Sequence, residues 1–589
     1  MEKFERTTSC GLVNKQWLGK TINLSGWVSR RRDHGGLIFI DLRDRSGVMQ
    51  IVFNPDFDKT AHAAAHDLRS EYVISVSGEI VERTPETTNK EMPTGKWELQ
   101  VKNLTVHSKS KTPPFSLEDA EKVDEELRLK YRYLDLRRVQ MQKNIKLRHQ
   151  VVFAIRELLN SEGFYEIETP ILTKNTPEGA REFLVPSRLH HGCFYAMPQS
   201  PQLYKQLLMA AGMEKYFQIA RCFRDEDLRA DRQPEFTQLD LEMSFVKEDD
   251  IMSVVEKIIQ HVFKKVLNKD IPIPFERIDY DQAFSEYGSD KPDLRFGLKI
   301  KESSSLFEKT ELSFLQAVLK KGGNIGGLHV QNCPFSRSEL NTWTEKAQKL
   351  GAKGLLWVRF KEDGSIESPV AKFLPEDFQA QANKIFENVG PNSVLFLIAG
   401  PYHDAWTTLG RLRLELARAL DIIPEGEFNL SWVVKFPMFE YDKENKRWDA
   451  MHHPFTSPQV GWEKLEPGKM KARAYDVVLN GVELGGGSIR IHDSETQSKV
   501  FELLGLNKDQ AEKKFGFLLE AQTYGFPPHG GLGLGLDRFV MLLAGQETIR
   551  EVIAFPKTQR MYDLMMSAPS VSDPQMLQEY GLKLLPKKK

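Results

Sequence analysis

One segment, residues 217–245, places a dense group of charged side chains between two apolar stretches that are typical of strands. Guanidinium groups are not buried without partners, and each can bind a phosphate through two parallel hydrogen bonds. The segment therefore indicates either a polyanion-binding loop or a solvated charged hairpin. Which of these two interpretations applies depends on the four arginines of the segment, Arg221, Arg224, Arg229 and Arg232.

Two further segments are rich in glycine. In "GVELGGGSIRIHD" (481–493), three consecutive glycines within a strand pattern indicate either a β-bulge or the close approach of a ligand or a backbone. In "GLGLGLDRFVMLLAG" (531–545), alternating glycines lead into an apolar helix. This pattern matches neither a dinucleotide fingerprint nor a G-K-[ST] phosphate loop. Its small residues leave room for a flat ring, and Arg538 at the junction could lie over that ring or against a phosphate.

The composition limits the classes of protein. A chain of 589 residues predicts three or four domains, and a net charge of −1 confines nucleic-acid contacts to local patches. The four cysteines are scattered, which suits a reducing cytoplasm and holds no zinc. The start of the chain carries no secretory signal pattern. The longest apolar run, 393–400, is too short to cross a membrane and predicts a buried strand instead.

The elements that must position these residues fall into blocks. Residues 1–107 show five strand patterns with a helical pattern at 60–70 between the third and fourth, as expected for an OB-type β-barrel. An SH3-like barrel is the alternative, because strand count alone barely separates the two. The polar, proline-containing residues 108–140 are typical of a linker or hinge.

The rest of the chain predicts a larger α+β domain with a second domain inserted into it. Apolar residues at helical spacing predict a helix over 141–163, and a strand broken by Pro170 follows. We expect a first catalytic part at 141–285, an inserted α+β domain at 286–420 and a second catalytic part at 421–560. Residues 561–589 are expected to be a C-terminal extension.

Taken together and in this order, the segments resemble the signature motifs of class II aminoacyl-tRNA synthetases. The predicted helix and strand around Pro170 resemble motif 1, which builds the dimer interface in that family. "CFRDEDLRADRQPEF" (222–236) resembles motif 2, and "GLGLGLDRF" (531–539) resembles motif 3. The OB-type domain is similar to the anticodon-binding domain of the IIb subgroup. The resemblance implies an antiparallel-sheet catalytic core and a homodimer.

Three shorter stretches narrow the resemblance to bacterial-type aspartate–tRNA ligases: "TPEGAREFLVPS" (176–187), "QSPQLYKQLLM" (199–209) and "AMHHPFTSP" (450–458). The inserted (GAD-like) domain fits the same group. The resemblance implies a two-step reaction with no covalent enzyme intermediate. L-Aspartate and ATP give aspartyl-adenylate and diphosphate, and the aspartate then passes to the 3′ end of a tRNA. Mg²⁺ is the implied metal.

The resemblance also implies a pocket for aspartate. Glu178 would take the substrate ammonium, and Lys205 and Arg490 its side-chain carboxylate. Asparagine would leave such donors unpaired, so discrimination of order 10⁴ needs no editing. The remaining residues implied for this pocket are Gln202, Arg224 between the α-carboxylate and the α-phosphate, and His452 on a closing loop.

For the nucleotide, the resemblance implies that Arg224 and Arg538 are catalytic and neutralise the phosphates. Glu483, with Asp476, would carry Mg²⁺, which requires hard oxygen ligands. The other residues implied for ATP binding are Asp225, Glu226, Gln233, Gly535, Leu536 and Asp537.

The basic stretch "RRRDHGG" (30–36) lies between the first two predicted strands, where OB-type folds engage single-stranded nucleic acid. Arg30, Arg32, Phe39 and Gln50 are the expected anticodon contacts. His34 resembles the relaxed type of enzyme, which charges both tRNA(Asp) and tRNA(Asn). Enzymes restricted to tRNA(Asp) tend to carry leucine there, and this strict type is the alternative. Glu86, at a second discriminating position, matches neither type.

Rival hypotheses remain on the same core. A lysine–tRNA ligase disagrees with the Lys205 and Arg490 pair, and an asparagine synthetase relative would lack residues 1–107. An asparagine–tRNA ligase is a further alternative. An inactive, RNA-binding paralogue would be expected to have lost Arg224, Glu178 or Arg538, all of which are present.

Overall fold

The computed structural model describes residues 5–175 and 180–586. The chain forms two compact units. The first comprises Met1–Arg148 and Thr548–Val571, and the second comprises His149–Glu547 and Ser572–Lys589. Among the described residues, no helix is both long and apolar enough to traverse a bilayer. The domain boundaries expected from the sequence stay predictions.

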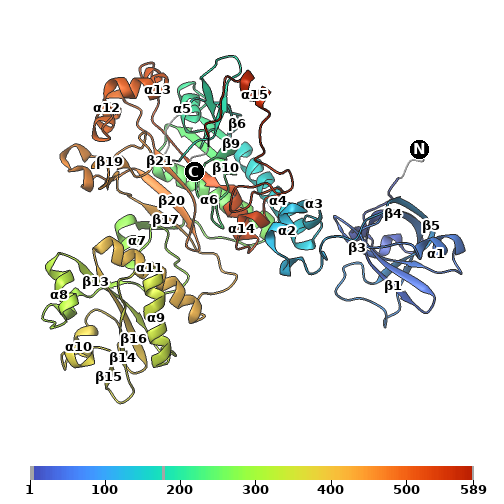
Figure 1. Ribbon diagram of the computed structural model, residues 1–589, viewed down its shortest axis with the longest axis horizontal. Helices are drawn as coiled ribbons and strands as arrows, with labels where there is room; N and C mark the ends of the chain where they lie inside the picture. Colours follow the sequence, from blue (N-terminus) through green and yellow to red (C-terminus); the bar gives the residue numbers. More distant parts are fainter. Residues whose placement is uncertain (1–4, 176–179, 587–589) are drawn as a thin grey trace. The chain divides into compact units, whose positions relative to one another are not determined.

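The first unit contains a closed five-stranded barrel in the order β1-β2-β3-β5-β4, drawn in blue in Figure 1. Helix α1 (Lys59–Ala65) lies between β3 and β4 in the chain, so the OB-type prediction is confirmed, although the helix is shorter than the 60–70 pattern suggested. Alternate residues of each strand fill the interior because successive side chains point to opposite faces. The strands are β1 (Thr21–His34), β2 (Leu37–Asp44), β3 (Gly47–Phe53), β4 (Val73–Glu82) and β5 (Trp97–Ser108).

A charged core completes this unit. Helices α2 (Glu125–Lys130) and α3 (Arg132–Asp135) precede the long helix α4 (Val139–Ser161). Asp135 is fully buried and accepts from Arg138 Nε at 2.6 Å, while Glu551 accepts from Arg128 Nη1 at 2.9 Å. Buried ion pairs of this kind fix geometry because leaving either partner alone is costly. They hold the returning segment Thr548–Val571 within the unit.

The second unit is built on an eight-stranded sheet in the order β11-β17-β20-β21-β22-β10-β9-β6. It is antiparallel except for the outer pairs β11·β17 and β6·β9. The predicted strand around Pro170 is present only as β6, because proline has no N–H to give to a ladder. The strands are β6 (Tyr165–Glu166), β9 (Lys215–Phe223), β10 (Glu235–Ser244), β11 (Glu276–Asp279), β17 (Leu430–Val434), β20 (Ala474–Leu479), β21 (Val482–Ile489) and β22 (His529–Gly535).

Helices pack against both faces of this sheet. Helix α6 (Glu248–Val262) packs behind the sheet, where Glu256 accepts from Trp432 Nε1 at 2.9 Å. Helix α14 (Leu536–Leu543) continues directly from β22, and its Phe539 contacts Phe263, which follows α6. Helix α5 (Gln202–Ala210) lies over the opposite face, where it contacts β10. The remaining helices of this layer are α7 (Tyr280–Tyr287), α12 (Ser494–Leu503), α13 (Lys508–Gln522) and α15 (Pro574–Glu579).

The expected inserted α+β domain has its own five-stranded sheet, ordered β12-β13-β16-β14-β15 (Figure 1). The run 393–400 is the buried strand β16, as predicted. Two apolar clusters, one on α9 and α11 and one on α8 and α10, cover the sheet. The elements are β12 (Lys301–Glu302), α8 (Ser313–Lys320), β13 (Asn324–Val330), α9 (Arg337–Lys349), β14 (Leu356–Phe360), β15 (Ile366–Glu367), α10 (Phe378–Ala382), β16 (Ser393–Gly400) and α11 (Tyr402–Ala419).

Two short hairpins complete the second unit. One joins β7 (Leu184–Pro186) to β8 (Phe194–Ala196), and the other joins β18 (Phe439–Asp442) to β19 (Arg447–Ala450). The first follows the undescribed residues 176–179, and the second precedes the predicted loop at 450–458.

Candidate active site

Strand alternation gathers polar side chains on the α5 face of the large sheet. Asp240 and Glu242 of β10 share this face because they are two residues apart. Their cross-strand partners on β22 are Gly533 and Gly531. A Cβ at Gly531 would lie 2.0 Å from Glu242 Oε2. A side chain at Gly531 would therefore collide with this buried carboxylate.

Two cations and two anions meet above these strands. Lys205 Nζ lies 2.7 Å from Asp240 Oδ1 and 3.2 Å from Glu242 Oε2. Arg490 Nε donates to Glu242 Oε1 at 2.9 Å. Each of the four residues is at most 2% exposed. The structure thus brings the predicted Lys205 and Arg490 together, and it adds two acids that the sequence reasoning missed.

The two carboxylates differ electrostatically. Burial raises the pKa of Asp240 although Lys205 opposes it. At Glu242, burial is outweighed by Arg490 and Lys205, which lower its pKa. Asp240 Oδ2 is also buried with no hydrogen-bond partner among the described residues. The cluster thus pairs two buried cations with two buried acids, of which Glu242 contacts both cations.

The loop 450–458 places two histidines differently. Arg490 Nη1 donates to His453 Nε2. Burial, assisted by the Arg490 charge, lowers the pKa of His453 well below its usual value, so this imidazole is neutral. His452 instead packs edge-on against Phe436, and burial lowers its pKa to about 4. His453 thus contacts the charged cluster, whereas the closing role of His452 stays a prediction.

The remaining residues predicted for aspartate binding are only partly described. Glu178 lies outside the described residues. Gln202 is 7% exposed in the first turn of α5, and its Nε2 has no hydrogen-bond partner within the described chain. Because Gln202 and Lys205 are three residues apart on a helix, they share a face. Gln202 therefore has a buried donor available near the charged cluster.

The predicted phosphate cations each have one buried, unused nitrogen. Arg224 Nε and Arg538 Nε have no partner among the described residues. The Arg224 guanidinium lies 5.1 Å from the centre of the Phe236 ring. Arg538 donates through Nη1 to the Glu483 carbonyl oxygen at 2.5 Å and through Nη2 to Asp231 Oδ2 at 3.1 Å. Both arginines are held and retain donors for a ligand.

Several other residues predicted for ATP binding have structural partners. Asp537 Oδ2 accepts from the Thr237 backbone N–H at 2.7 Å, which ties α14 to β10. Glu226 accepts from Arg232 Nη1 at 3.0 Å. The side chain of Leu536 is fully buried, so only its backbone can reach a ligand. Asp225 pairs through its backbone with Arg181 in an isolated bridge.

Two more predicted ATP-binding residues lie at the edges of this region. Gln233 is 4% exposed, just before β10. Gly535 ends β22, where an added Cβ would be 3.4 Å from the Leu484 carbonyl oxygen. A Cβ there would make only ordinary van der Waals contact with β21, so the local packing alone does not require glycine at this position.

The predicted metal ligands lie on neighbouring strands. Asp476 of β20 is 8% exposed, and a Cβ at Gly486 would lie 2.3 Å from its Oδ1. Burial, Glu483 and Asp290 raise the pKa of Asp476 well above its usual value. No cluster of three or more metal-ligating side chains occurs in the described part of the chain. The oxygen pair Asp476 and Glu483 suits a hard cation that also takes ligands from phosphates.

In the first unit, the basic hairpin is exposed. His34 pairs with Leu37 at its tip, and Gly35 and Gly36 turn the chain with φ of 58° and 84°. His62 of α1 contacts the Gly36 carbonyl oxygen through Nε2 at 2.9 Å. His34 is therefore exposed to solvent on a turn that His62 holds through its contact with Gly36.

The predicted anticodon contacts follow the same hairpin. Arg32 and Phe39 are cross-strand partners, and Arg30 is exposed nearby. Arg32 Nη2 donates to Asp41 Oδ1 at 2.7 Å and to Gln50 Oε1 at 3.3 Å. Gln50 is 5% exposed, so its side chain lies within a hydrogen-bond network with Arg32 and Glu98 and not on an open surface. Phe39 is half-buried and available for stacking.

The second predicted discriminating position also lies in the first unit. Glu86 is fully exposed in the turn between β4 and β5. Hydrogen bonds with its own backbone and with Thr84 lower the pKa of its carboxyl group. The glutamate is therefore an ionised surface residue held by its own turn.

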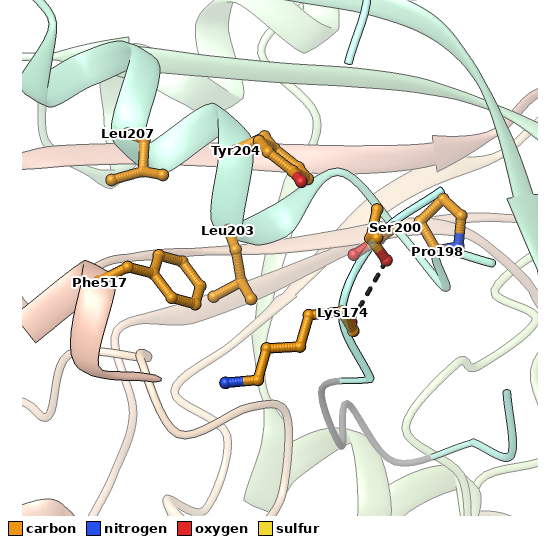
Figure 2. A pocket seen from close by; sticks show the side chains of 8 residues that line it. Lys174, Pro198, Ser200, Leu203, Tyr204, Leu207 and Phe517 are labelled. Carbon is orange, nitrogen blue, oxygen red and sulfur yellow. Dashed lines mark hydrogen bonds between the residues drawn. The ribbon is translucent and has the colours of Figure 1, made fainter. Parts of the chain in front are cut away.

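A cavity of about 200 Å³ lies on the other side of α5 (Figure 2). Leu203, Tyr204 and Leu207 of α5 line it, together with Phe517 of α13. Lys205, between them in the chain, points instead to the buried charges of the sheet. No role for this cavity was predicted from the sequence.

Comparisons with known proteins agree with this architecture. The model of the family described as "tRNA synthetases class II (D, K and N)" matches residues 124–559, and that of the "OB-fold nucleic acid binding domain" matches residues 22–106. The "Aspartate--tRNA(Asp/Asn) ligase" of Caldanaerobacter subterraneus subsp. tengcongensis is 51% identical over 98% of both chains. The "Aspartate--tRNA ligase" of Staphylococcus carnosus is 50% identical over 98% of this chain and 99% of that protein.

A solved structure shows the same fold at lower identity. It is asparaginyl-tRNA synthetase from Pyrococcus horikoshii complexed with asparaginyl-adenylate, with a TM-score of 0.60 and 20% identity. The match covers 94% of this chain and 98% of that one. With a family model covering most of its length and relatives at about half identity, the chain belongs to the class II tRNA synthetases of the D, K and N group.

Proposed function

We propose that this synthetase is an aspartate–tRNA ligase that uses ATP to charge tRNA(Asp) and tRNA(Asn). The buried cluster of Lys205, Arg490, Asp240 and Glu242 is the observation that carries the choice of amino acid. Glu242 contacts both cations, and Asp240 lies 2.7 Å from Lys205. A substrate carboxylate can accept charge-assisted hydrogen bonds from Lys205 and Arg490, whereas the amide of asparagine brings no negative charge to these cations.

The same cluster explains rejection of other substrates. A lysine substrate would bring a third cation to Lys205 and Arg490. Asparagine would turn an amide N–H₂ towards the buried donors and leave a donor unpaired. Each unpaired buried donor costs about 1–3 kcal/mol. A site built on charge-assisted hydrogen bonds can discriminate by about 10⁴-fold without editing.

In the first step, the substrate α-carboxylate attacks the α-phosphorus of ATP. Arg224 orients the carboxylate and the α-phosphate, Arg538 neutralises the polyphosphate, and Glu178 holds the ammonium. Catalysis comes from positioning and from charges fixed before the reaction, and no enzyme side chain is acylated. Asp476 and Glu483 would hold Mg²⁺, which supplies further positive charge to the phosphates. In the second step, the terminal ribose hydroxyl of the tRNA takes the aspartyl group.

For the tRNA partner, the exposed hairpin supports the relaxed type. His34 offers one compact polar group at the tip, and an imidazole can donate to or accept from either of two bases. The relative from Caldanaerobacter carries Asp/Asn in its name, whereas the one from Staphylococcus carnosus does not. Charging of tRNA(Asp) alone is therefore the alternative.

We also infer a homodimer through motif 1. Large apolar side chains on and after α4 are exposed, which is unusual unless a partner covers them. Phe153 is 64% exposed, Tyr165 63% and Leu172 50%. A second copy of the chain is the partner that the family resemblance implies. Sedimentation of the purified protein tests this inference, and a monomer at micromolar concentration contradicts it.

ATP–diphosphate exchange with single amino acids tests the activation step. We expect exchange with aspartate, and at least 10³-fold less with asparagine or lysine. Arg224→Ala and Arg538→Ala should each lower exchange by about 10²–10³-fold, because each removes a fixed charge from the transition state. Exchange at the wild-type rate in both variants would contradict these assignments. Charging of purified tRNA(Asp) and tRNA(Asn) then distinguishes the relaxed from the strict type.

A further inference from the structure

The loop 288–298 leads from α7 into the inserted domain and is held tightly by that domain. Arg413 of α11 is 1% exposed. Its Nη2 donates to the carbonyl oxygens of Asp293, Phe296 and Gly297 at 2.8–2.9 Å, and its Nε donates to that of Leu298 at 3.0 Å. A single guanidinium thus binds four carbonyl oxygens of the loop, and the loop has little freedom to move.

The same loop also contacts the catalytic sheet. Asp293 is 4% exposed and binds Arg295 through two hydrogen bonds, at 3.0 and 2.7 Å. Its Cβ would lie 2.9 Å from a Cβ built on Gly481, the turn residue between β20 and β21. Because φ at Gly481 is +79°, both the backbone and the space favour glycine there. The loop is therefore seated against the two strands that carry the predicted metal ligands.

The position of this loop brings Lys291 close to two acidic residues, Glu483 and Asp290. Lys291 Nζ lies 3.8 Å from Glu483 Oε2 and 4.0 Å from Asp290 Oδ1. It makes the only ion pair to the Glu483 side chain within the described chain. Both distances are long, and the Lys291 side chain is 46% exposed. An ion pair of this kind is weak, so the ammonium can turn towards a stronger anion at little cost.

Glu483 contacts both Lys291 and Arg538, the arginine of the motif 3 segment. Arg538 Nη1 donates to the Glu483 backbone oxygen at 2.5 Å, while Lys291 approaches its side chain. Two cations therefore flank one residue at the edge of the site. Nearby, Asp476 of the adjacent strand β20 is 8% exposed.

We propose that Lys291 binds the β- and γ-phosphates of ATP and neutralises the diphosphate as it leaves. This proposal rests on the proposed function of the same site. A bond forms between the aspartate carboxylate oxygen and the α-phosphorus. The bond from that phosphorus to the α–β bridging oxygen breaks, and its electron pair leaves with the diphosphate. Negative charge grows on the leaving group, where an ammonium on a rigid loop stabilises it.

The inserted domain thereby acquires a role in activation. Arg413, on its last helix, holds the backbone of the loop that carries Lys291. Arg413 is a positioning residue, because it touches the loop and not the nucleotide.

The test compares Lys291→Met and Lys291→Arg with a matched control, Lys299→Met. Lys299 ends the same stretch of chain, is 44% exposed and pairs with Glu286 at 2.7 Å. In ATP–diphosphate exchange, Lys291→Met should raise the KM for diphosphate and for ATP by 10-fold or more and leave the KM for aspartate within 2-fold. Lys291→Arg should recover most of this loss, and Lys299→Met should match the wild type.

A second measurement separates a phosphate contact from a structural role. Transfer of aspartate from synthetic aspartyl-adenylate to tRNA occurs after diphosphate has left, so Lys291→Met should transfer at the wild-type rate. An unchanged KM for diphosphate, or equal losses in exchange and transfer, would overturn the proposal. Full rescue of Lys291→Met by added Mg²⁺ would also overturn it, since Lys291 would then act only through Glu483. Failure of the wild type to use aspartate would instead overturn the proposed function.

Discussion

The proposed aspartate pocket and the basic hairpin each pair a cation with an aspartate, but in different surroundings. In the pocket, Lys205 and Asp240 meet at 2.7 Å and are at most 2% exposed. In the hairpin, Arg32 and Asp41 also meet at 2.7 Å, but the Arg32 side chain is 41% exposed. Removing one partner costs about 3–5 kcal/mol when the pair is buried, whereas an exposed pair contributes about 0–1 kcal/mol. We therefore expect the choice of amino acid to be rigid and the choice of tRNA to be adjustable.

The largest effect should come from Arg490→Leu. It leaves Glu242 buried beside one cation instead of two, and it removes a donor for the substrate carboxylate. We expect aspartate-dependent exchange to fall by about 10³-fold and the free energy of unfolding to fall by about 3–5 kcal/mol. Exchange kinetics and denaturant unfolding of the purified variant measure the two quantities.

A matched exposed arginine provides the control. Arg447 pairs with Asp449 at 3.0 Å, but its side chain is 60% exposed. Arg447→Leu should change stability by less than about 1 kcal/mol and leave exchange intact. Similar losses in the two variants would show that burial does not separate the two kinds of ion pair in this protein.

A smaller effect should come from His529, which lies on the sheet face of the pocket two residues before Gly531. It is fully buried, and its Nδ1 contacts the Pro527 carbonyl oxygen at 2.8 Å. Burial lowers its pKa to about 4 from an ordinary value of 6.5. Between these values only the unfolded state binds the proton. The contribution of His529 to the free energy of unfolding is therefore complete above pH 6.5. It falls by about 1.4 kcal/mol per pH unit below pH 6.5 and levels off near pH 4.

His529→Asn should flatten this dependence. Calorimetric unfolding at pH 7, 6 and 5 should show a shallower decline than the wild type, with the contributions of His452 and His453 remaining. The exposed His190→Asn serves as the control and should retain the wild-type profile. Parallel profiles for wild type and His529→Asn would mean that this histidine is not a source of acid sensitivity.

The sequence was informative where structure is local. The five barrel strands, the turn into α14 and the paired strands around the motif 2 loop follow from alternation, glycine turns and apolar spacing over a few residues. The acids of the pocket were missed because Asp240 and Glu242, read along β10 alone, resemble the solvent face of a strand. Their partner Arg490 lies 248 residues away from Glu242 and meets it only through the strand order.

Two other features lay beyond sequence reasoning for different reasons. His452 and His453 are adjacent in a loop without periodicity, so the sequence cannot tell which one faces the cluster. Lys291 follows the predicted boundary at residue 285, and its sequence context "SDKPD" is typical of an ordinary polar turn. The structure shows that this turn is held by the four carbonyl contacts of Arg413 and lies against the catalytic strands where Asp293 approaches Gly481.

The smallest effect should come from the hairpin, and it addresses the tRNA choice directly. His34→Leu removes one exposed polar group from the tip and leaves the arginines in place. A single exposed hydrogen bond contributes about 0.5–1.5 kcal/mol, so charging of tRNA(Asn) should fall about 3–10-fold more than charging of tRNA(Asp). Aminoacylation of both purified tRNAs measures this ratio, and exchange with aspartate should stay unchanged.

The control for this change is Arg30→Ala on the same strand. Phosphate contacts position an RNA without reading its sequence, so this variant should weaken both tRNAs to the same extent and reduce the salt dependence of charging. If His34→Leu also weakens both equally, or if the wild type does not charge tRNA(Asn), His34 is only part of the basic surface. Because His34 stands on a turn held by His62 and is not buried among charges, its substitution can shift the tRNA ratio without cost to the fold.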